Sequence, residues 1–177
     1  PELIDAALEK SAPGRRYALA LDLGCGDGLM GAALRPRVEI LVGVDLSAAM
    51  VALARERGVY DKLARKDIRA FLEQSRAASA DLVVAADVLP YFGDLRELFA
   101  AIARALRSHG IFVLTAELLD GEGYAIGEAL RFAHSGAYLS ECAAEAGLGK
   151  PRLQRAVLRR EKGHDAPGWV ALFEKTS

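Results

Sequence analysis

Residues 21–31 read Leu-Asp-Leu-Gly-Cys-Gly-Asp-Gly-Leu-Met-Gly and continue an apolar run that begins at Tyr17. Glycines alternate through the stretch at Gly24, Gly26 and Gly28. Such a run predicts a strand, a tight turn and a helix, because glycine lets the backbone approach a ligand with no Cβ in the way. The free N–H groups at the start of the helix would face the same space. We therefore expect a binding turn; the alternative is that the glycines serve only the packing of a strand against a helix.

The charge of this turn indicates the kind of ligand. Gly26, Gly28 and Gly31 fit the spacing of the dinucleotide fingerprint. Asp22, however, ends the predicted strand, and Asp27 lies within the turn. Two carboxylates so close together would repel a pyrophosphate. They would attract a ligand that carries an amino group and a sulfonium, which describes S-adenosylmethionine.

Residues 21–28 resemble the first motif of the class I methyltransferases. The resemblance implies that S-adenosylmethionine is the cofactor and S-adenosylhomocysteine the product. It assigns the methionine site to the three alternating glycines, with Asp22 acting on the cationic end directly or through water. Cys25 is interpreted as a small filler residue of the same site, because no histidine or metal-ligand cluster lies near it in the sequence. We accordingly predict no metal.

Length and composition are those of one globular domain. The chain has 177 residues, of which 52% are hydrophobic and 27% charged, so it can bury a core. The formal net charge of −1 gives no reason to expect nucleic acid or an anionic membrane as a partner. No apolar stretch has the length of a membrane span, and no signal-peptide pattern opens the chain. Two cysteines, Cys25 and Cys142, make no disulfide framework, which favours a cytoplasmic protein.

Strand and helix patterns alternate along the chain. Strands are expected at residues 17–23, 39–44, 62–66, 81–86, 111–116, 152–161 and 168–175. Helices are expected at residues 2–10, 29–34, 47–58, 95–107 and 136–146, with a short one around Phe71. This alternation predicts an α/β fold with an open, doubly wound, Rossmann-like sheet. The methyltransferase resemblance implies a mostly parallel, seven-stranded sheet with an antiparallel C-terminal hairpin.

Local signals predict where some of these elements begin and end. Ser47 is expected to cap a helix that stops at Gly58. Asp94 and Glu97 have the spacing of a capping box for the long helix that follows. Residues 163–168 carry the signal of a hairpin turn.

The second predicted strand ends in a candidate ribose contact. The carboxylate of Asp45, next to Leu46, can accept both ribose hydroxyls of an adenosine ligand. The same residue would serve NAD, and a helix-entry cap shared with Ser47 is the alternative. Met50, one turn into the next helix, is expected to pack either on the adenine or in the core.

The third and fourth strands end in further candidates. In the family that the chain resembles, an acid after strand three lies near the adenine amino group, a place that Asp67 and the backbone of Ile68 match; a helix cap is the alternative. Ala86 is small enough to let the methionine half approach. Asp87 would orient the acceptor or simply finish the strand. Tyr91 would either form a wall of the methyl-transfer pocket or cover the core.

His134 is a candidate general base, since an unperturbed imidazole titrates near neutral pH. The alternative is a helix-entry residue, because His134 precedes the predicted cap Ser135. The candidate catalytic residues are therefore Asp87, Tyr91 and His134. The arginines at residues 152–160 are expected on the solvent face of an edge strand.

Three segments narrow the resemblance: residues 42–47, 58–63 and 91–95 look like bacterial predicted methyltransferases of the tetratricopeptide-repeat-associated and ubiquinone-biosynthesis-like group. No such repeats occur in this chain, which begins at Pro1. We therefore expect a single methyltransferase domain over residues 1–177, with any N-terminal module absent or trimmed. The chain departs from the family at residues 108–110, where Ser-His-Gly stands in place of the usual Pro-Gly-Gly.

The sequence thus predicts in-line methyl transfer to a small-molecule acceptor. A net charge of only −1 and the lack of an Asn-Pro-Pro-Tyr-like motif at strand four disfavour nucleic acid. A nicotinamide-dependent oxidoreductase remains an alternative, opposed by the acidic turn and by the lack of a Tyr-x-x-x-Lys pair. A non-catalytic adenosyl-binding module that regulates a partner is another, favoured by the lack of a convincing base. The oligomeric state stays undetermined.

Overall fold

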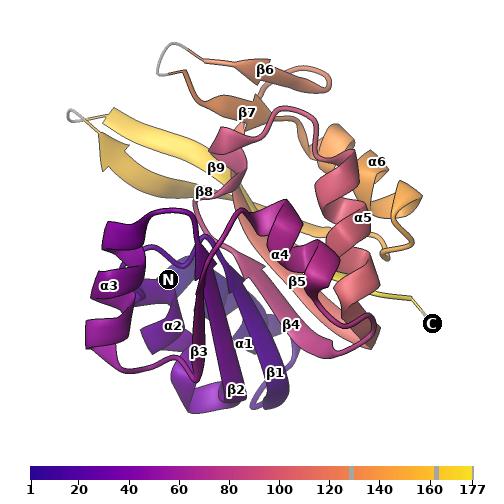
Figure 1. The fold of residues 1–177 in the computed structure, drawn as a ribbon. Helices are drawn as coiled ribbons and strands as arrows, with labels where there is room; N and C mark the ends of the chain where they lie inside the picture. The colour runs from indigo at the N-terminus through magenta and orange to yellow at the C-terminus, as the bar shows by residue number, and fades with distance from the viewer. Residues whose placement is uncertain (128–129, 162–163, 177) are drawn as a thin grey trace.

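The computed structural model describes residues 1–127, 130–161 and 164–176. Its described part contains one sheet of nine strands, in which β3, β2, β1, β4 and β5 lie side by side and parallel (Figure 1). The antiparallel strand β9 pairs with the outer edge of β5, and β8 pairs with β9. These strands are β1 (Tyr17–Leu23), β2 (Val38–Asp45), β3 (Lys62–Arg65), β4 (Ala80–Ala85), β5 (Leu106–Leu118), β8 (Arg152–Glu161) and β9 (His164–Glu174).

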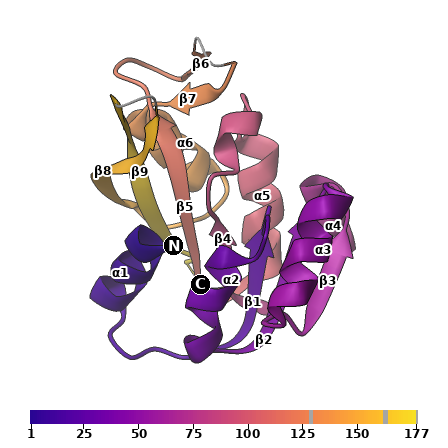
Figure 2. The ribbon, with the colours of Figure 1, turned by 90° about the vertical axis from the view of Figure 1, so that its left-hand side faces the viewer.

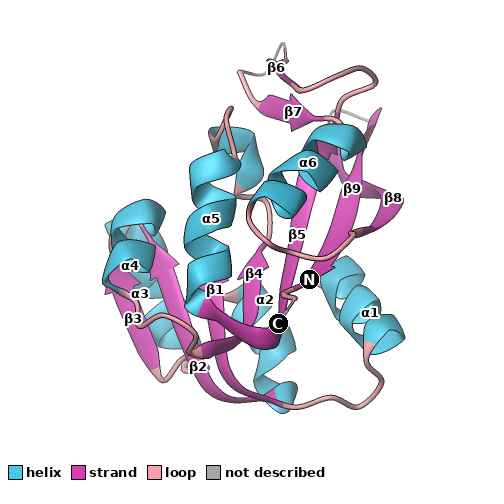
Figure 3. Ribbon diagram, turned by 90° about the vertical axis from the view of Figure 1, so that its right-hand side faces the viewer, coloured by secondary structure: helices cyan, strands magenta, loops and turns pink. Residues whose placement is uncertain are grey.

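Helices cover both faces of this sheet (Figure 2). One face packs against α1 and α2, and the other packs against α4, α5 and α6. Figure 3 shows α1 and α5 on opposite sides of the strands. The helices are α1 (Glu2–Ser11), α2 (Leu29–Leu34), α3 (Ala48–Arg57), α4 (Ile68–Gln74), α5 (Arg96–Ala105) and α6 (Gly136–Glu145), with short 3-10 helices η1 (Arg35–Arg37) and η2 (Leu89–Tyr91).

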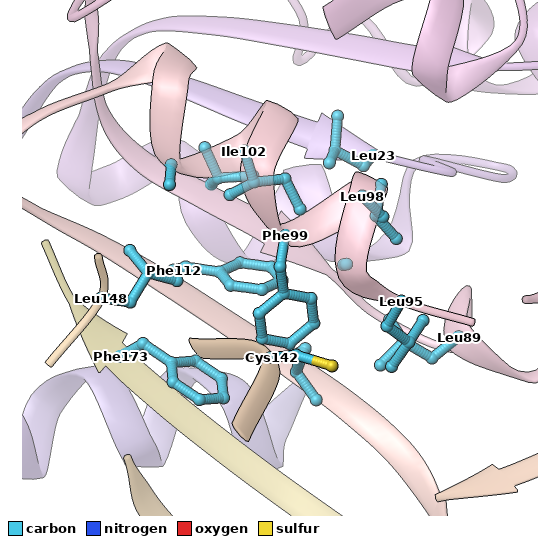
Figure 4. Packing of buried hydrophobic residues seen from close by; sticks show 14 of the residues in the cluster. Leu23, Leu89, Leu95, Leu98, Phe99, Ile102, Phe112, Cys142, Leu148 and Phe173 are labelled. Carbon is cyan, nitrogen blue, oxygen red and sulfur yellow. The ribbon is translucent and has the colours of Figure 1, made fainter. Parts of the chain in front are cut away.

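The central strands are buried on both faces, as expected of parallel strands between two helix layers. In β4, Leu82 and Val84 join the core under α1 and α2, whereas Val83 and Ala85 join the core under α5 and α6. Three phenylalanines lie at the centre of the core under α5 and α6 (Figure 4). The ring of Phe99 meets the rings of Phe112 and Phe173 edge-on, at centroid distances of 5.3 and 5.4 Å.

The predicted doubly wound α/β fold with an antiparallel C-terminal hairpin is confirmed, but the sheet has more strands than the seven expected. Two short strands, β6 (Tyr124–Ile126) and β7 (Phe132–His134), form a hairpin after β5. Glu117 of β5 pairs with β7 and also with Gly168 of β9, so β7 extends the sheet beyond the end of β4. Strands of three residues are too short to show the alternation by which a strand is recognised in a sequence.

The predicted capping box at α5 is wrong. Leu95, not Asp94, occupies the N-cap position, and its side chain makes no cap hydrogen bond. The Asp94 carboxylate accepts the N–H of Arg96 and the hydroxyl of Tyr138, at 3.0 Å each. Glu97 pairs instead with Arg69 on the surface. Sequence spacing alone gave no sign of these tertiary partners.

The turn between α5 and β5 explains why β5 begins earlier than expected. The helix ends at Ala105, not near 107, and Leu106 already pairs with Ala80 of β4. His109 then adopts a φ of +60°, a conformation that glycine takes most easily. A histidine therefore occupies the left-handed turn at the place where the family carries a glycine pair.

The end of the chain also differs from expectation. The predicted hairpin turn covered residues 163–168, of which residue 163 lies outside the described residues, while residues 164–168 already belong to β9. Elsewhere, Ser47 caps α3 and Gly58 ends it with a φ of +69°, as predicted. Within the part of the chain that the structure describes, no helix is long and apolar enough to span a membrane.

Candidate functional site

The glycine turn joins β1 to α2 with a left-handed backbone at each of its three alternating glycines. Gly24, Gly26 and Gly28 have φ values of +67°, +53° and +88°. A Cβ at Gly24 would stand 2.4 Å from Cγ2 of Val88, so this glycine permits close packing. A Cβ at Gly26 would meet nothing within 4 Å. The turn therefore combines a packing glycine with one whose missing side chain leaves open space.

A cavity of about 1030 Å³ opens against this turn at the carboxyl ends of the parallel strands. It has the size and place expected of a ligand site in a doubly wound sheet. The predicted cofactor residues on its wall are Gly24, Cys25, Gly26, Asp45, Leu46, Met50, Asp67, Ile68, Ala86 and Asp87. Asp22 and Gly28 are not among the lining residues. Sequence analysis did not assign Leu29, Met30, Ser47 and Val88, which also line the cavity.

Asp45 connects the second strand to the glycine turn. Its Oδ2 atom accepts the N–H of Gly26 at 3.0 Å, and its Oδ1 atom accepts the N–H of Ser47 at 2.8 Å. The carboxylate therefore takes part in the helix entry and lines the cavity as well. Each of its oxygens keeps a lone pair for a further donor.

Asp67 likewise both caps a helix and lines the cavity. Its Oδ1 atom accepts the N–H groups of Arg69 and Ala70 at 2.9 and 3.1 Å, so it is the N-cap of α4. The alternative that sequence analysis left open, a helix cap, is thus present, while Asp67 and Ile68 also face the cavity. Their contact with an adenine stays a prediction.

Asp22 lies beneath the turn and is only 1% exposed. The hydroxyl of Tyr60 donates to its Oδ2 atom at 2.7 Å, while Oδ1 has no hydrogen-bond partner among the described residues. Burial raises the pKa of Asp22 to about 6, although the hydrogen bond from Tyr60 lowers it. An acid buried in this way acts on the cavity through its field or through a water, not from the cavity wall.

Asp27 does not carry the free charge that the sequence argument assumed. Nη2 of Arg57 lies 3.1 Å from its Oδ2 atom, and Nε of Arg57 donates to the backbone carbonyl of Asp27 at 2.9 Å. The expected repulsion of a pyrophosphate by Asp27 is therefore largely offset. Arg57 was missed because α3 meets the turn only in the folded chain.

Cys25 is the small buried residue that was predicted. Burial, together with the charges of Asp22 and Asp45, raises the pKa of its thiol to about 12. A thiol this resistant to ionisation is no nucleophile at neutral pH. Among the described residues there is also no cluster of side chains that could hold a metal ion.

Asp87 and Tyr91, two of the candidate catalytic residues, line the cavity; their catalytic role stays a prediction. Asp87 has a φ of +56°, and Nη2 of Arg131 lies 2.5 Å from its Oδ1 atom. Arg131 also lies over the Tyr91 ring, 5.7 Å from its centroid, and Tyr91 itself is 73% exposed. Nε of Arg131 binds Glu117 at 2.6 Å, which ties the β6–β7 hairpin to the end of β5.

His134 is not among the residues that line the cavity, so its position gives no support to a role as general base. The ring is fully buried, its Nε2 atom lies 3.1 Å from the Gly93 carbonyl, and it stacks on Tyr138. Burial lowers its pKa, which keeps the imidazole neutral. The alternative given above, a residue that precedes α6, agrees with the structure, because the next residue, Ser135, caps that helix.

Comparison with known proteins places these features in context. A family profile described as a methyltransferase domain matches residues 21–114, more than half of the chain. The malonyl-[acyl-carrier protein] O-methyltransferase of Salmonella typhimurium is 31% identical over 102 residues, which are 58% of this chain and 40% of that protein. The chain thus spans less than half the length of this curated relative.

Two solved structures share the fold. The 1,6-didemethyltoxoflavin-N1-methyltransferase of Burkholderia thailandensis, solved with S-adenosylhomocysteine, is similar with a TM-score of 0.76 over 99% of this chain and 77% of that chain, at 22% identity. The [4+2]-cyclase SpnF is similar with a TM-score of 0.80 over 99% of this chain and 80% of that chain, at 16% identity. At these identities the likeness concerns the fold alone.

Proposed function

Because this chain belongs to the methyltransferase domain family, the class I S-adenosylmethionine-dependent methyltransferases, we propose that its cavity binds S-adenosylmethionine for methyl transfer to a small molecule. The charge of the cavity wall carries this proposal. Four of the described lining residues are aspartates, namely Asp27, Asp45, Asp67 and Asp87, and no described lining residue is Lys or Arg. Arg57 and Arg131 pair with Asp27 and Asp87, so the acidic character of the wall rests on Asp45 and Asp67. Such a wall favours a cationic ligand and offers no positively charged side chain of its own to a pyrophosphate.

The residues present fit the cofactor. A ligand can lie against Gly26, where a side chain would otherwise stand, and the cavity volume admits an adenosyl group with its amino acid. In this proposal Asp45 accepts the ribose hydroxyls, and Asp67 with Ile68 contacts the adenine. The glycines of the turn and Ala86 form the methionine site, with Asp22 beneath it. The cofactor supplies an electrophilic methyl group, and the chain supplies alignment of the two reactants.

The acceptor enters, in this proposal, at the rim formed by Asp87 and Tyr91. Arg131 holds the Asp87 carboxylate in place, so Asp87 orients the acceptor instead of removing a proton from it. The name of the Salmonella relative gives an O-methyltransferase and that of the Burkholderia neighbour an N-methyltransferase, and the two leave the acceptor atom open.

We also propose that the chain belongs to a particular group within the methyltransferase family. Residues 42–47, 58–63 and 91–95 support membership of the tetratricopeptide-repeat-associated, ubiquinone-biosynthesis-like group. A cytoplasmic location is supported by Cys25 and Cys142, which are both buried and free. A nucleic-acid acceptor finds no support in the net charge of −1.

The deciding experiment is a pair of calorimetric titrations with S-adenosylhomocysteine and with NAD. We expect micromolar binding of S-adenosylhomocysteine and no heat from NAD. NAD binding alone would overturn the proposal in favour of an oxidoreductase. If S-adenosylhomocysteine binds, the protein is then incubated with S-adenosylmethionine and panels of small hydroxyl and amine acceptors. Mass spectrometry of the acceptors detects any added methyl group. Methylated product indicates an enzyme, and its absence from every panel favours a non-catalytic binding module.

A further inference from the structure

Tyr60 lies in the segment between α3 and β3, and its ring is packed against three glycines. A Cβ at Gly31 would stand 2.3 Å from its Cζ and Oη atoms, and one at Gly43 would stand 2.8 Å from Cε1. A Cβ at Gly28 would stand 3.1 Å from Cε2. The missing side chains of these residues make the room that the Tyr60 ring occupies, behind the turn and away from the cavity wall.

The hydroxyl of the same ring reaches the acid under the turn. It donates to Oδ2 of Asp22 at 2.7 Å and is the only hydrogen-bond donor to that carboxylate within the described residues. Burial and the adjacent Asp22 charge raise the pKa of Tyr60, so the phenol stays protonated and remains a donor. A fixed donor on one oxygen holds the carboxylate in one orientation.

We propose that Tyr60 is a positioning residue of the cofactor site, which holds the Asp22 carboxylate in place beneath the glycine turn through its hydroxyl and supports the turn through its ring. Tyr60 is not among the residues that line the cavity, so its effect on the cofactor passes through Asp22 and the turn. The inference rests on the proposed function, since it concerns the same cofactor.

The groups around Asp22 set the pH at which this effect appears. Burial raises the pKa of Asp22 to about 6, the Tyr60 hydrogen bond lowers it and the charge of Asp45 raises it; Cys25, nearby, stays a neutral thiol. Loss of the hydroxyl therefore raises the pKa of Asp22. For a rise of about one unit, the charged fraction at pH 6 falls from about one half to about one tenth, and at pH 7 from about nine tenths to about one half.

The test is Tyr60→Phe, which keeps the ring and removes only the hydroxyl. The Kd of S-adenosylhomocysteine is measured by calorimetry at about pH 6, 7 and 8.5. We expect binding to weaken about fivefold at pH 6 and about twofold at pH 7, with little change at pH 8.5. Tyr17→Phe is the matched control, because Tyr17 is a buried tyrosine at the other end of β1, and its pH profile should follow the wild type.

A double-mutant cycle decides whether Tyr60 acts through Asp22. In an Asp22→Asn background, Tyr60→Phe should change the Kd no further, because the carboxylate is gone. Equal Kd values for wild type and Tyr60→Phe at every pH would overturn the inference while the proposed function stands. An undiminished effect of Tyr60→Phe in the Asp22→Asn background would also overturn it. A wild type that binds no S-adenosylhomocysteine contradicts the proposed function itself, and the inference falls with it.

Discussion

Gly26 and Gly14 have the same backbone conformation in different surroundings. Their φ values are +53° and +66°, and a Cβ on either would meet nothing within 4 Å. Gly26 borders the cavity, whereas Gly14 lies in the loop between α1 and β1, away from it. Alanine substitutions at the two glycines therefore separate two effects. Both variants lose stability because alanine resists the left-handed conformation, but only the one at Gly26 places a side chain in the space proposed for the ligand.

We therefore predict that Gly26→Ala abolishes binding of S-adenosylhomocysteine, while Gly14→Ala leaves it unchanged. Both variants should lose about 1 kcal/mol of stability, because a left-handed conformation is costly for alanine. Calorimetric titration gives the Kd, and denaturant unfolding gives the stability. Wild-type affinity in Gly26→Ala would show that the ligand does not approach this glycine.

The thiol of Cys25 offers a second test at single-residue scale. Its pKa of about 12 leaves only a trace of thiolate at pH 8, and the thiol of Cys142 is also buried. Native protein should therefore take up no iodoacetamide over an hour, and protein unfolded in guanidinium should take up two equivalents. Intact-mass measurement counts the adducts. Rapid labelling of Cys25 in the folded protein would contradict this and make Cys25 a candidate nucleophile.

The two helices α5 and α6 begin in different ways. Oγ of Ser135 is buried and accepts the N–H of Tyr138 at 3.1 Å, which satisfies a free donor of α6. Glu97, by contrast, extends into solvent and pairs with Arg69. The element that looked capped in the sequence, α5, is held by packing of Leu98, Phe99 and Ile102.

This difference leads to opposite expectations for two substitutions. Ser135→Ala should cost about 1 kcal/mol of unfolding free energy, since a buried cap is lost. Glu97→Ala should change the unfolding free energy by less than about 0.5 kcal/mol, because an exposed ion pair contributes little. Urea denaturation of the two variants measures both values. A loss of 1 kcal/mol in Glu97→Ala would instead support the capping box.

At the scale of the whole molecule, buried titratable groups make stability depend on pH. The pKa of Asp22 rises from 3.8 to about 6 on folding, so between these values the folded state binds more protons than the unfolded state. Stability from this group therefore falls as the pH rises through that window. Burial lowers the pKa of His134, which acts with the opposite sign: its contribution is lost as the pH falls through the lowered pKa.

The substitution Asp22→Asn separates the two contributions to the pH dependence of stability, because it removes the Asp22 titration and keeps that of His134. The free energy of unfolding of this variant, relative to the wild type, should rise by about 2 kcal/mol between about pH 4 and pH 8. Any effect of the introduced amide on stability that does not depend on pH is the same at both pH values, so it does not contribute to this change. Chemical denaturation at the two pH values measures it. A difference that does not change with pH would show that the pKa of Asp22 is not raised by folding.

Most of the architecture was readable from local patterns. Apolar runs such as residues 82–86, separated by helical segments, predicted a parallel sheet, because strands that are buried on both faces carry such runs. The alternating glycines predicted the turn because few other residues take its backbone conformation. These properties belong to neighbouring residues, so the sequence alone determined the fold class, the turn and the sheet edge at which the cavity lies.

Tertiary structure decided what each charged or polar side chain does there. It neutralised Asp27 with Arg57, buried His134 away from the cavity and brought Tyr60 to Asp22, across 38 positions of the chain. It also turned residues near 124 and 132 into a hairpin that pairs beyond β4. Such partners are distant in sequence and meet only when the sheet and helices pack, and side-chain charge, burial and pKa depend on that proximity.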